Sequence, residues 1–233
     1  IIYLLMNWQG IYFTFSNLFI FTLLYRFFYF ILHNILLKTS DKYNTLTIYK
    51  QKYIVKNFIK SFILFTLVIK YDTLLNLFNN NINLKTIQYN GAIYVANDFL
   101  GLLYIKNLPK STKLHHLTTL LLLFVISIVE NENILIYKLI YTYTIYSYHA
   151  FLVNLYLGLR YFECNNIYIN NFINNIRIFA FYNYLICCLA NLFTHFYIIY
   201  INYLQIDYTI LLYSMCVIPI INDDIILLKW LKK

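Results

Sequence analysis

The chain has 233 residues, of which 61% are hydrophobic and only 12% are charged. A soluble domain carries about 25% charged residues, so this composition excludes an ordinary soluble protein and indicates an integral membrane protein. The net charge of +9 would suggest a nucleic-acid partner in a soluble protein, but the positions of the basic residues explain it without nucleic acid.

Seven apolar segments approach or exceed the roughly 20 residues that a transmembrane helix needs. They are residues 11–37, 58–78, 87–105, 109–129, 134–158, 176–201 and 208–231. Asparagine-rich connections are expected at 76–84 and 163–175. Pro219 and the pair Asp223 and Asp224 indicate a kink or an early end in the last segment.

This pattern predicts an all-α integral membrane protein, a bundle of about seven transmembrane helices. We divide the chain into residues 1–54, an N-terminal transmembrane helix with a basic loop, and residues 55–233, a six-helix transmembrane domain. Gly and Pro number only four and two, which favours uninterrupted helices over a barrel.

Most of the 18 basic residues lie in alternate connections between these segments. They gather in the loop 38–60, around 106–113, between 160 and 177, and in the C-terminal tail. The remaining connections hold only Lys85 and Lys138. Because basic residues concentrate on the cytoplasmic side, we expect a cytoplasmic C-terminus and an N-terminus on the opposite side.

Three ionisable residues lie where a bilayer would make them costly. Asp98 is in the third segment, and His115 and His116 open the fourth, just after Pro109. At 1.5 Å per residue, Asp98 lies roughly 15 Å from the intervening loop and the histidines roughly 9–10 Å. We expect them to reach similar depth, with Asp98 protonated or paired with a His or Lys, because intramembrane ionisable groups are usually paired or functional.

Other polar residues in the apolar segments are candidates for substrate binding. Thr119 lies one helical turn beyond His115 and could share its hydrogen bonds. His149 and Asn154 lie in the fifth segment. The four cysteines form no C-x-x-C motif and have no Cys/His metal spacing, so we expect no metal site and no bound cofactor.

Two stretches resemble the TLC (TRAM, Lag and CLN-type) domain family. The stretch "YVANDFLGLLYIKNLPKSTKLHHLTTLLLL" (94–123) has the family's order of an Asp-bearing helix, a basic turn and a helix that opens with His-His. The stretch "YSYHAFLVNLYLGLRYF" (146–162) is similar to a later family helix. The matching residues are Asp98, Lys106, Lys110, Lys113, His115, His116, Thr119, Leu122, Asn154 and Arg160.

The resemblance implies a TLC-like helical membrane protein of ER-like endomembranes that acts in lipid metabolism or in control of membrane lipid composition. Ceramide synthases of this family transfer an acyl group from acyl-CoA to a long-chain amine, with a catalytic His pair. By that analogy His115, His116 and Asp98 would be catalytic, acyl-CoA would be a co-substrate, and membrane lipids would be partners. Oligomerisation stays open.

One departure from the ceramide synthases bears on the reaction. Those enzymes carry a second motif in which His is followed by Asp, whereas here His149 is followed by Ala150 and no His-Asp pair occurs. The chain is nearer to TLC proteins that lack this motif. The alternative is a non-catalytic membrane subunit of a larger, organellar complex. A di-iron hydroxylase needs about eight histidines, and this chain has five.

Overall fold

The structure, a computed structural model, describes residues 7–69, 83–128, 134–164, 166–206 and 208–233. Within these ranges every regular element is a helix, which confirms the all-helical part of the predicted fold class. The elements are α1 (Trp8–Thr39), α2 (Asp41–Asn44), α3 (Ile48–Ile69), α5 (Leu84–Tyr104), α6 (Lys110–Ile128), α7 (Ile134–Tyr148), α8 (Phe151–Leu159), η1 (Arg160–Phe162), α9 (Ile167–Ile201), η2 (Tyr203–Gln205) and α10 (Tyr208–Lys232).

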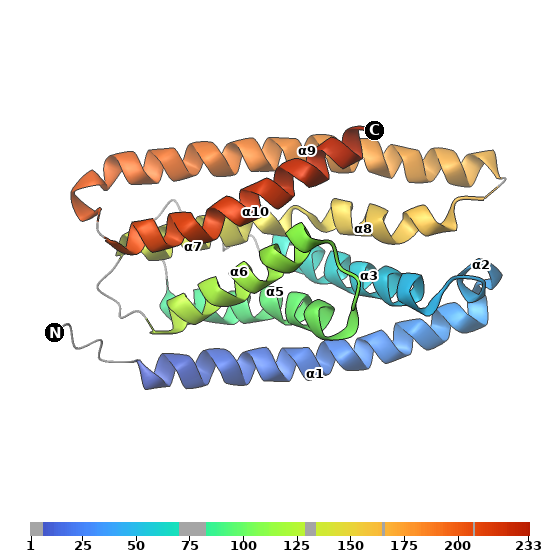
Figure 1. Cartoon of the computed structure of the whole chain (residues 1–233), viewed down its shortest axis with the longest axis horizontal. Helices are drawn as coiled ribbons and strands as arrows, with labels where there is room; N and C mark the ends of the chain where they lie inside the picture. Colours follow the sequence, from blue (N-terminus) through green and yellow to red (C-terminus); the bar gives the residue numbers. More distant parts are fainter. Residues whose placement is uncertain (1–6, 70–82, 129–133, 165, 207) are drawn as a thin grey trace.

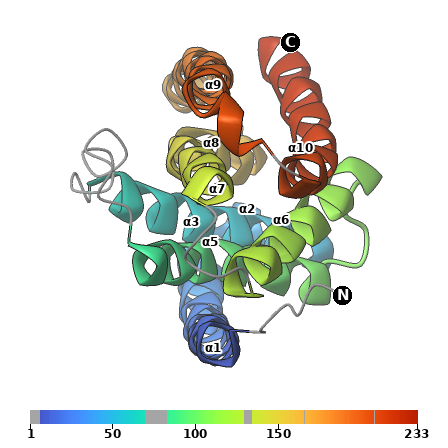
Figure 2. The same cartoon turned by 90° about the vertical axis from the view of Figure 1, so that its left-hand side faces the viewer.

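The long helices run along one direction and stack in layers (Figure 1). The end view shows α1 on one outer side, then α3, α5 and α6, then α7, α8 and α10, with α9 on the opposite outer side (Figure 2). Contacts follow this order, with α1 against α5, α3 against α8, and α6 against α10. The middle layers therefore have protein on both sides, whereas α1 and α9 have one outward face.

Asparagines begin several of the helices. The side chain of Asn7 accepts a hydrogen bond from the Gly10 amide, Asn83 accepts from the Lys85 amide, and Asn166 accepts from the amides of Tyr168 and Ile169. A side-chain oxygen at this position satisfies an amide that has no partner within the helix. Some of the asparagines of this chain therefore define where helices begin.

Two predicted boundaries are wrong. Helix α3 begins at Ile48, so the stretch from 48 to 60 is helix where a loop was expected. Helix α9 begins at Ile167, so most of the expected connection 163–175 is its first turns. Both regions contain charged or amide side chains. These side chains make the regions less hydrophobic than the neighbouring segments, but they do not prevent helix formation. The expected connection 76–84 lies mostly outside the described residues.

The fifth predicted segment is two helices, α7 and α8, which meet around His149 and Ala150. Neighbouring helices supply partners for the backbone at this break. The Ser61 hydroxyl donates to the carbonyl of Phe151 at 2.8 Å, and the Asn183 amide donates to the carbonyl of His149 at 2.7 Å. These bonds hold the junction against α3 and α9.

Among the described residues, four helices are long and apolar enough to cross a membrane: Trp8–Thr39, Lys110–Ile128, Ile167–Ile201 and Ile210–Lys232. Many large apolar side chains on α1 and α9 are exposed, as lipid-facing surfaces would be. Helix α3 carries four lysines, and α7 and α8 are each shorter than 18 residues. The structure is consistent with a membrane protein, and the count of seven spans stays a prediction.

The main core joins the first helix to the rest of the chain. Leu18 and Tyr25 of α1 belong to the same buried cluster as residues of α3, α5, α6 and α7. The predicted division after residue 54 falls within α3. A smaller cluster lies between α8, α9 and α10.

Candidate functional site

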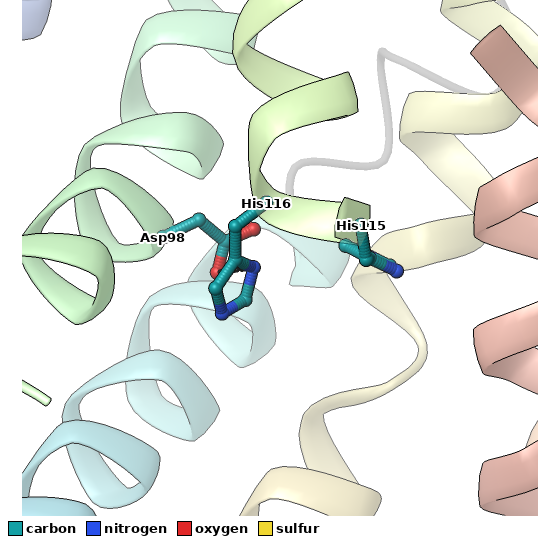
Figure 3. Close-up of side chains that lie close together, drawn as sticks. All are labelled: Asp98, His115 and His116. Atoms are coloured by element: carbon teal, nitrogen blue, oxygen red, sulfur yellow. Dashed lines mark ion pairs between the residues drawn. The ribbon is translucent and has the colours of Figure 1, made fainter. Parts of the chain in front are cut away.

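Asp98 is the centre of a buried charged cluster. It lies on α5 with no exposed surface, and Lys60 of α3 pairs with its Oδ1 at 2.5 Å. The Nδ1 atom of His116, on α6, lies 3.3 Å from the same oxygen (Figure 3). The expectation that Asp98 pairs with a His or Lys is therefore confirmed, with one partner of each kind.

His116 is engaged at both ring nitrogens. Its Nε2 lies 2.9 Å from Nζ of Lys56, and its Nδ1 faces Asp98. An ammonium group can only donate, so with Lys56 charged Nε2 is the acceptor and the ring proton is on Nδ1, toward the carboxylate. His116 thus joins Lys56 to Asp98 and has no free nitrogen for a substrate.

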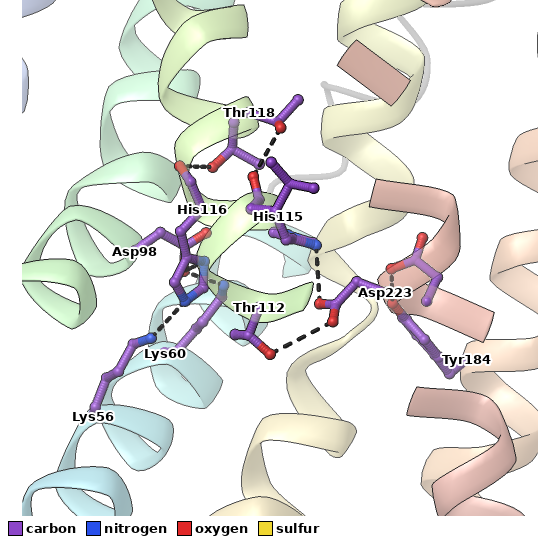
Figure 4. Close-up of polar contacts among 12 residues, drawn as sticks. Lys56, Lys60, Asp98, Thr112, His115, His116, Thr118, Tyr184 and Asp223 are labelled. Carbon is purple, nitrogen blue, oxygen red and sulfur yellow. Dashed lines mark hydrogen bonds and ion pairs between the residues drawn. The ribbon is translucent and has the colours of Figure 1, made fainter. Parts of the chain in front are cut away.

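His115 points elsewhere. Adjacent residues lie about 100° apart around a helix, and the centroids of the two imidazole rings are 5.6 Å apart with 88° between the ring planes. Nδ1 of His115 lies 3.3 Å from Oδ2 of Asp223 on α10, and the Thr112 hydroxyl lies 3.5 Å from the other oxygen of that carboxylate (Figure 4). One imidazole nitrogen of His115 therefore faces a carboxylate, and Nε2 is left for another partner.

The two histidines border a cavity of about 310 Å³ between α3, α6, α8, α9 and α10. Small-molecule sites usually have volumes of about 300–1,000 Å³. Its wall combines apolar side chains such as Leu157 and Leu227 with convergent polar ones. The polar and charged side chains of the lining include Tyr53, Lys56, Lys60, Thr112, His115, His116, Asn154, Arg160, Tyr184, Asp223 and Asp224.

A second carboxylate of α10 lies beside the first. Oδ1 of Asp224 accepts a hydrogen bond from the Tyr184 hydroxyl of α9 at 2.6 Å. The predicted early end at these residues is wrong, since α10 continues to Lys232 with Pro219 inside it, and the predicted kink stays a prediction. The acidic pair instead faces the cavity.

The three candidate substrate-binding residues have different surroundings. Asn154 lines the cavity, and its side chain donates to the Ala150 carbonyl. The Thr119 hydroxyl donates to the backbone carbonyl of His116 and borders a separate, smaller pocket. His149 lies at the junction of α7 and α8, outside the cavity lining.

The sequence interpretation missed four charged residues of the site. Lys56 and Lys60 were assigned to a cytoplasmic loop, yet both are buried on α3. Their i, i+4 spacing was the available signal, because it places both on one helix face. Asp223 and Asp224 were read only as a helix interruption, although two carboxylates within an apolar segment are costly unless paired.

Asp98, His115 and His116 also form a cluster in which one ligand atom from each lies within 4.8 Å of the others. A divalent cation would have to displace Lys60 from Asp98 or compete with Lys56 for His116. The two ammonium groups would also repel it. The donor set therefore fits a metal ion poorly.

Comparisons of the sequence with protein-family models and with curated proteins, and of the structure with solved structures, found no match.

Proposed function

We propose that this chain is a multi-pass, TLC-like membrane protein of lipid metabolism that transfers an acyl group from acyl-CoA to a lipid amine. The observation that carries the proposal is the His115–Asp223 pair at the wall of a mixed apolar and polar cavity. The likeness of residues 94–123 to the TLC motif supports the same reading.

The chemistry follows from the environment of His115. A carboxylate at Nδ1 orients an imidazole and stabilises its protonated form, as in Ser-His-Asp sites. Nε2 can then accept the proton of an attacking amine. The amine nitrogen forms a bond to the thioester carbonyl carbon, the carbon–sulfur bond breaks, and the departing thiolate takes up the proton from His115. Acid–base steps of this kind contribute about 10²–10⁴-fold in rate.

Asp223 bears on the missing His-Asp motif. The sequence has no His followed directly by Asp, but α10 brings a carboxylate to His115 through a tertiary contact. The lack of an adjacent pair is thus no obstacle to an imidazole–carboxylate arrangement. In this proposal His116 and Asp98 hold α3, α5 and α6 together and position the helix that bears His115.

The proposed setting is an ER-like endomembrane, with seven membrane-crossing segments and a cytoplasmic C-terminus. The exposed apolar faces of α1 and α9 support contact with lipid, and the distribution of lysine supports the orientation.

The test is transfer of label from acyl-CoA into membrane lipids by vesicles that carry the protein. His115→Ala should lower the rate by about 10²-fold or more, and Asp223→Asn should lower it less, because the imidazole remains. His33→Gln is the control, since this histidine lies on α1, outside the cavity lining.

His116→Ala should act mainly through reduced stability and protein yield. If the wild type and His115→Ala, expressed equally, give the same lipid profile, the catalytic proposal fails and a non-catalytic subunit becomes the better explanation.

A further inference from the structure

Arg160 lies at the end of α8 and lines the same cavity as His115. Aromatic rings surround its guanidinium group: Cζ is 4.7 Å from the ring centroid of Trp230, 4.8 Å from that of Tyr161 and 5.5 Å from that of Tyr53. Nη2 also donates to the Tyr161 hydroxyl at 3.0 Å. Stacking on aromatic faces fixes the plane of a guanidinium without neutralising its charge.

This arginine has no acidic partner within the part of the chain that the structure describes. The ion pairs found there are Lys60–Asp98, His115–Asp223 and His116–Asp98. Its Nε is buried and has no hydrogen-bond partner among the described residues. A buried donor without a partner is costly, so a group that accepts from it would be bound favourably.

A second cation lies at the same aromatic cluster. Nζ of Lys50, an exposed residue of α3, is 5.9 Å from the ring centroid of Tyr161. The acids of the cavity are engaged elsewhere, Asp223 with His115 and Thr112, and Asp224 with Tyr184. Two cations on one ring, with the two carboxylates of the cavity already engaged, are a charge arrangement suited to a doubly negative ligand.

We propose that Arg160 and Lys50 bind a phosphoryl group of the substrate, while the reacting group of that substrate reaches His115. The assignment to substrate depends on the proposed function, whereas the anion site itself does not. The planar fork of an arginine matches phosphate oxygens in two parallel hydrogen bonds. Two sources carry this chemistry: the nucleotide part of acyl-CoA and the headgroup of a phospholipid.

The chain offers a direct optical probe of this site. It has two tryptophans, and Trp230 stacks on Arg160. In a Trp8→Phe background, purified protein in uncharged detergent would be titrated at constant ionic strength with adenosine 3′,5′-bisphosphate and, separately, with dihexanoyl phosphatidate. A saturable change in the fluorescence of Trp230 with the nucleotide indicates the acyl-donor source, and a saturable change with the lipid indicates the headgroup source.

Variants then test the residues. Arg160→Gln should weaken binding about tenfold or more, as expected for loss of hydrogen bonds to a charged group. Arg177→Gln is the matched control, because this half-buried arginine of α9 bonds to Asn174 and does not line the cavity; the affinity of this variant should stay within about twofold of wild type. Lys50→Gln should weaken binding severalfold. Because Lys50 is exposed, this variant tests the anion site even if Arg160→Gln does not fold.

The inference is overturned if neither probe saturates the wild-type signal, or if Arg160→Gln and Lys50→Gln bind as tightly as Arg177→Gln. His115→Gln separates the two proposals, because it removes the proposed base and leaves the cationic pair in place. Full acyl transfer by His115→Gln, together with weak anion binding by Arg160→Gln, would refute the proposed reaction and leave the anion site standing.

Discussion

Replacing Asp98 by leucine should strongly destabilise the folded protein. This carboxylate is fully buried, and the side chain of its partner Lys60 is only 10% exposed. Removing Asp98 leaves the lysine charge without a counter-ion and removes the acceptor near Nδ1 of His116. Breaking a buried ion pair from one side costs about 3–5 kcal/mol.

Replacing both partners tests this explanation. In Asp98→Leu combined with Lys60→Met, apolar side chains take the place of both charges. Such replacement of a buried pair is often neutral or stabilising. We therefore expect the double variant to recover at least about 2 kcal/mol relative to Asp98→Leu alone, although Lys56 and His116 still lose their link to the carboxylate.

Thermal unfolding in detergent micelles measures both effects. For a chain of this length 1 kcal/mol corresponds to about 2–4 °C, so Asp98→Leu should lower the midpoint by about 6–20 °C. Glu163→Leu is the control, because this exposed acid has no ion pair in the described structure, and its midpoint should change by about 2 °C or less. The reasoning is refuted if Asp98→Leu has the same unfolding midpoint as the control, or if the double variant has a midpoint no higher than that of Asp98→Leu.

Three further predictions concern packing, hydrogen bonding and orientation. Gly158→Ala should destabilise the protein by about 1–3 kcal/mol in the same melt, because the added Cβ would lie 2.6 Å from the ring of Phe58, and Phe58→Leu should relieve part of the loss. Tyr213→Phe should cost about 1 kcal/mol, since its hydroxyl lies 2.6 Å from Nε2 of His195; an unchanged midpoint would contradict that bond. A protease-cleavable tag after Lys233 should be cut in sealed microsomes, and protection of the tag would reverse the predicted orientation.

The parts of the site that sequence predicted were those close together along the chain. Asp98 and the two histidines flank one turn at Pro109, so helix geometry alone placed them at similar depth. The different directions of His115 and His116 also follow from the 100° step of a helix. The all-helical class followed from the apolar segments and the scarcity of Gly and Pro.

The parts that sequence did not predict depend on distant contacts. Lys60 and Asp98 are 38 residues apart, and the carboxylate beside His115 comes from the last helix. Lysines near an apolar segment usually mark a cytoplasmic loop, so Lys56 and Lys60 were read as solvated. Only the packing of α3 against α5 shows that a partner compensates for their burial.

The position of the lysines on α3 has a consequence for biosynthesis. A lysine at the centre of a lone helix opposes membrane insertion by about 2.5–3.5 kcal/mol, and Lys56 and Lys60 both lie well inside α3. The partner of Lys60, Asp98, is on α5, and the partner of Lys56, His116, is on α6, and both helices leave the ribosome later. In the proposed arrangement of seven membrane-crossing segments, helix α3 should therefore remain at the translocon, or at the membrane surface, until α5 emerges, and the two helices should enter the bilayer together. A nascent chain arrested before Asp98 should accordingly have α3 accessible to water-soluble thiol reagents through a cysteine placed on it, and a chain arrested after α5 should not.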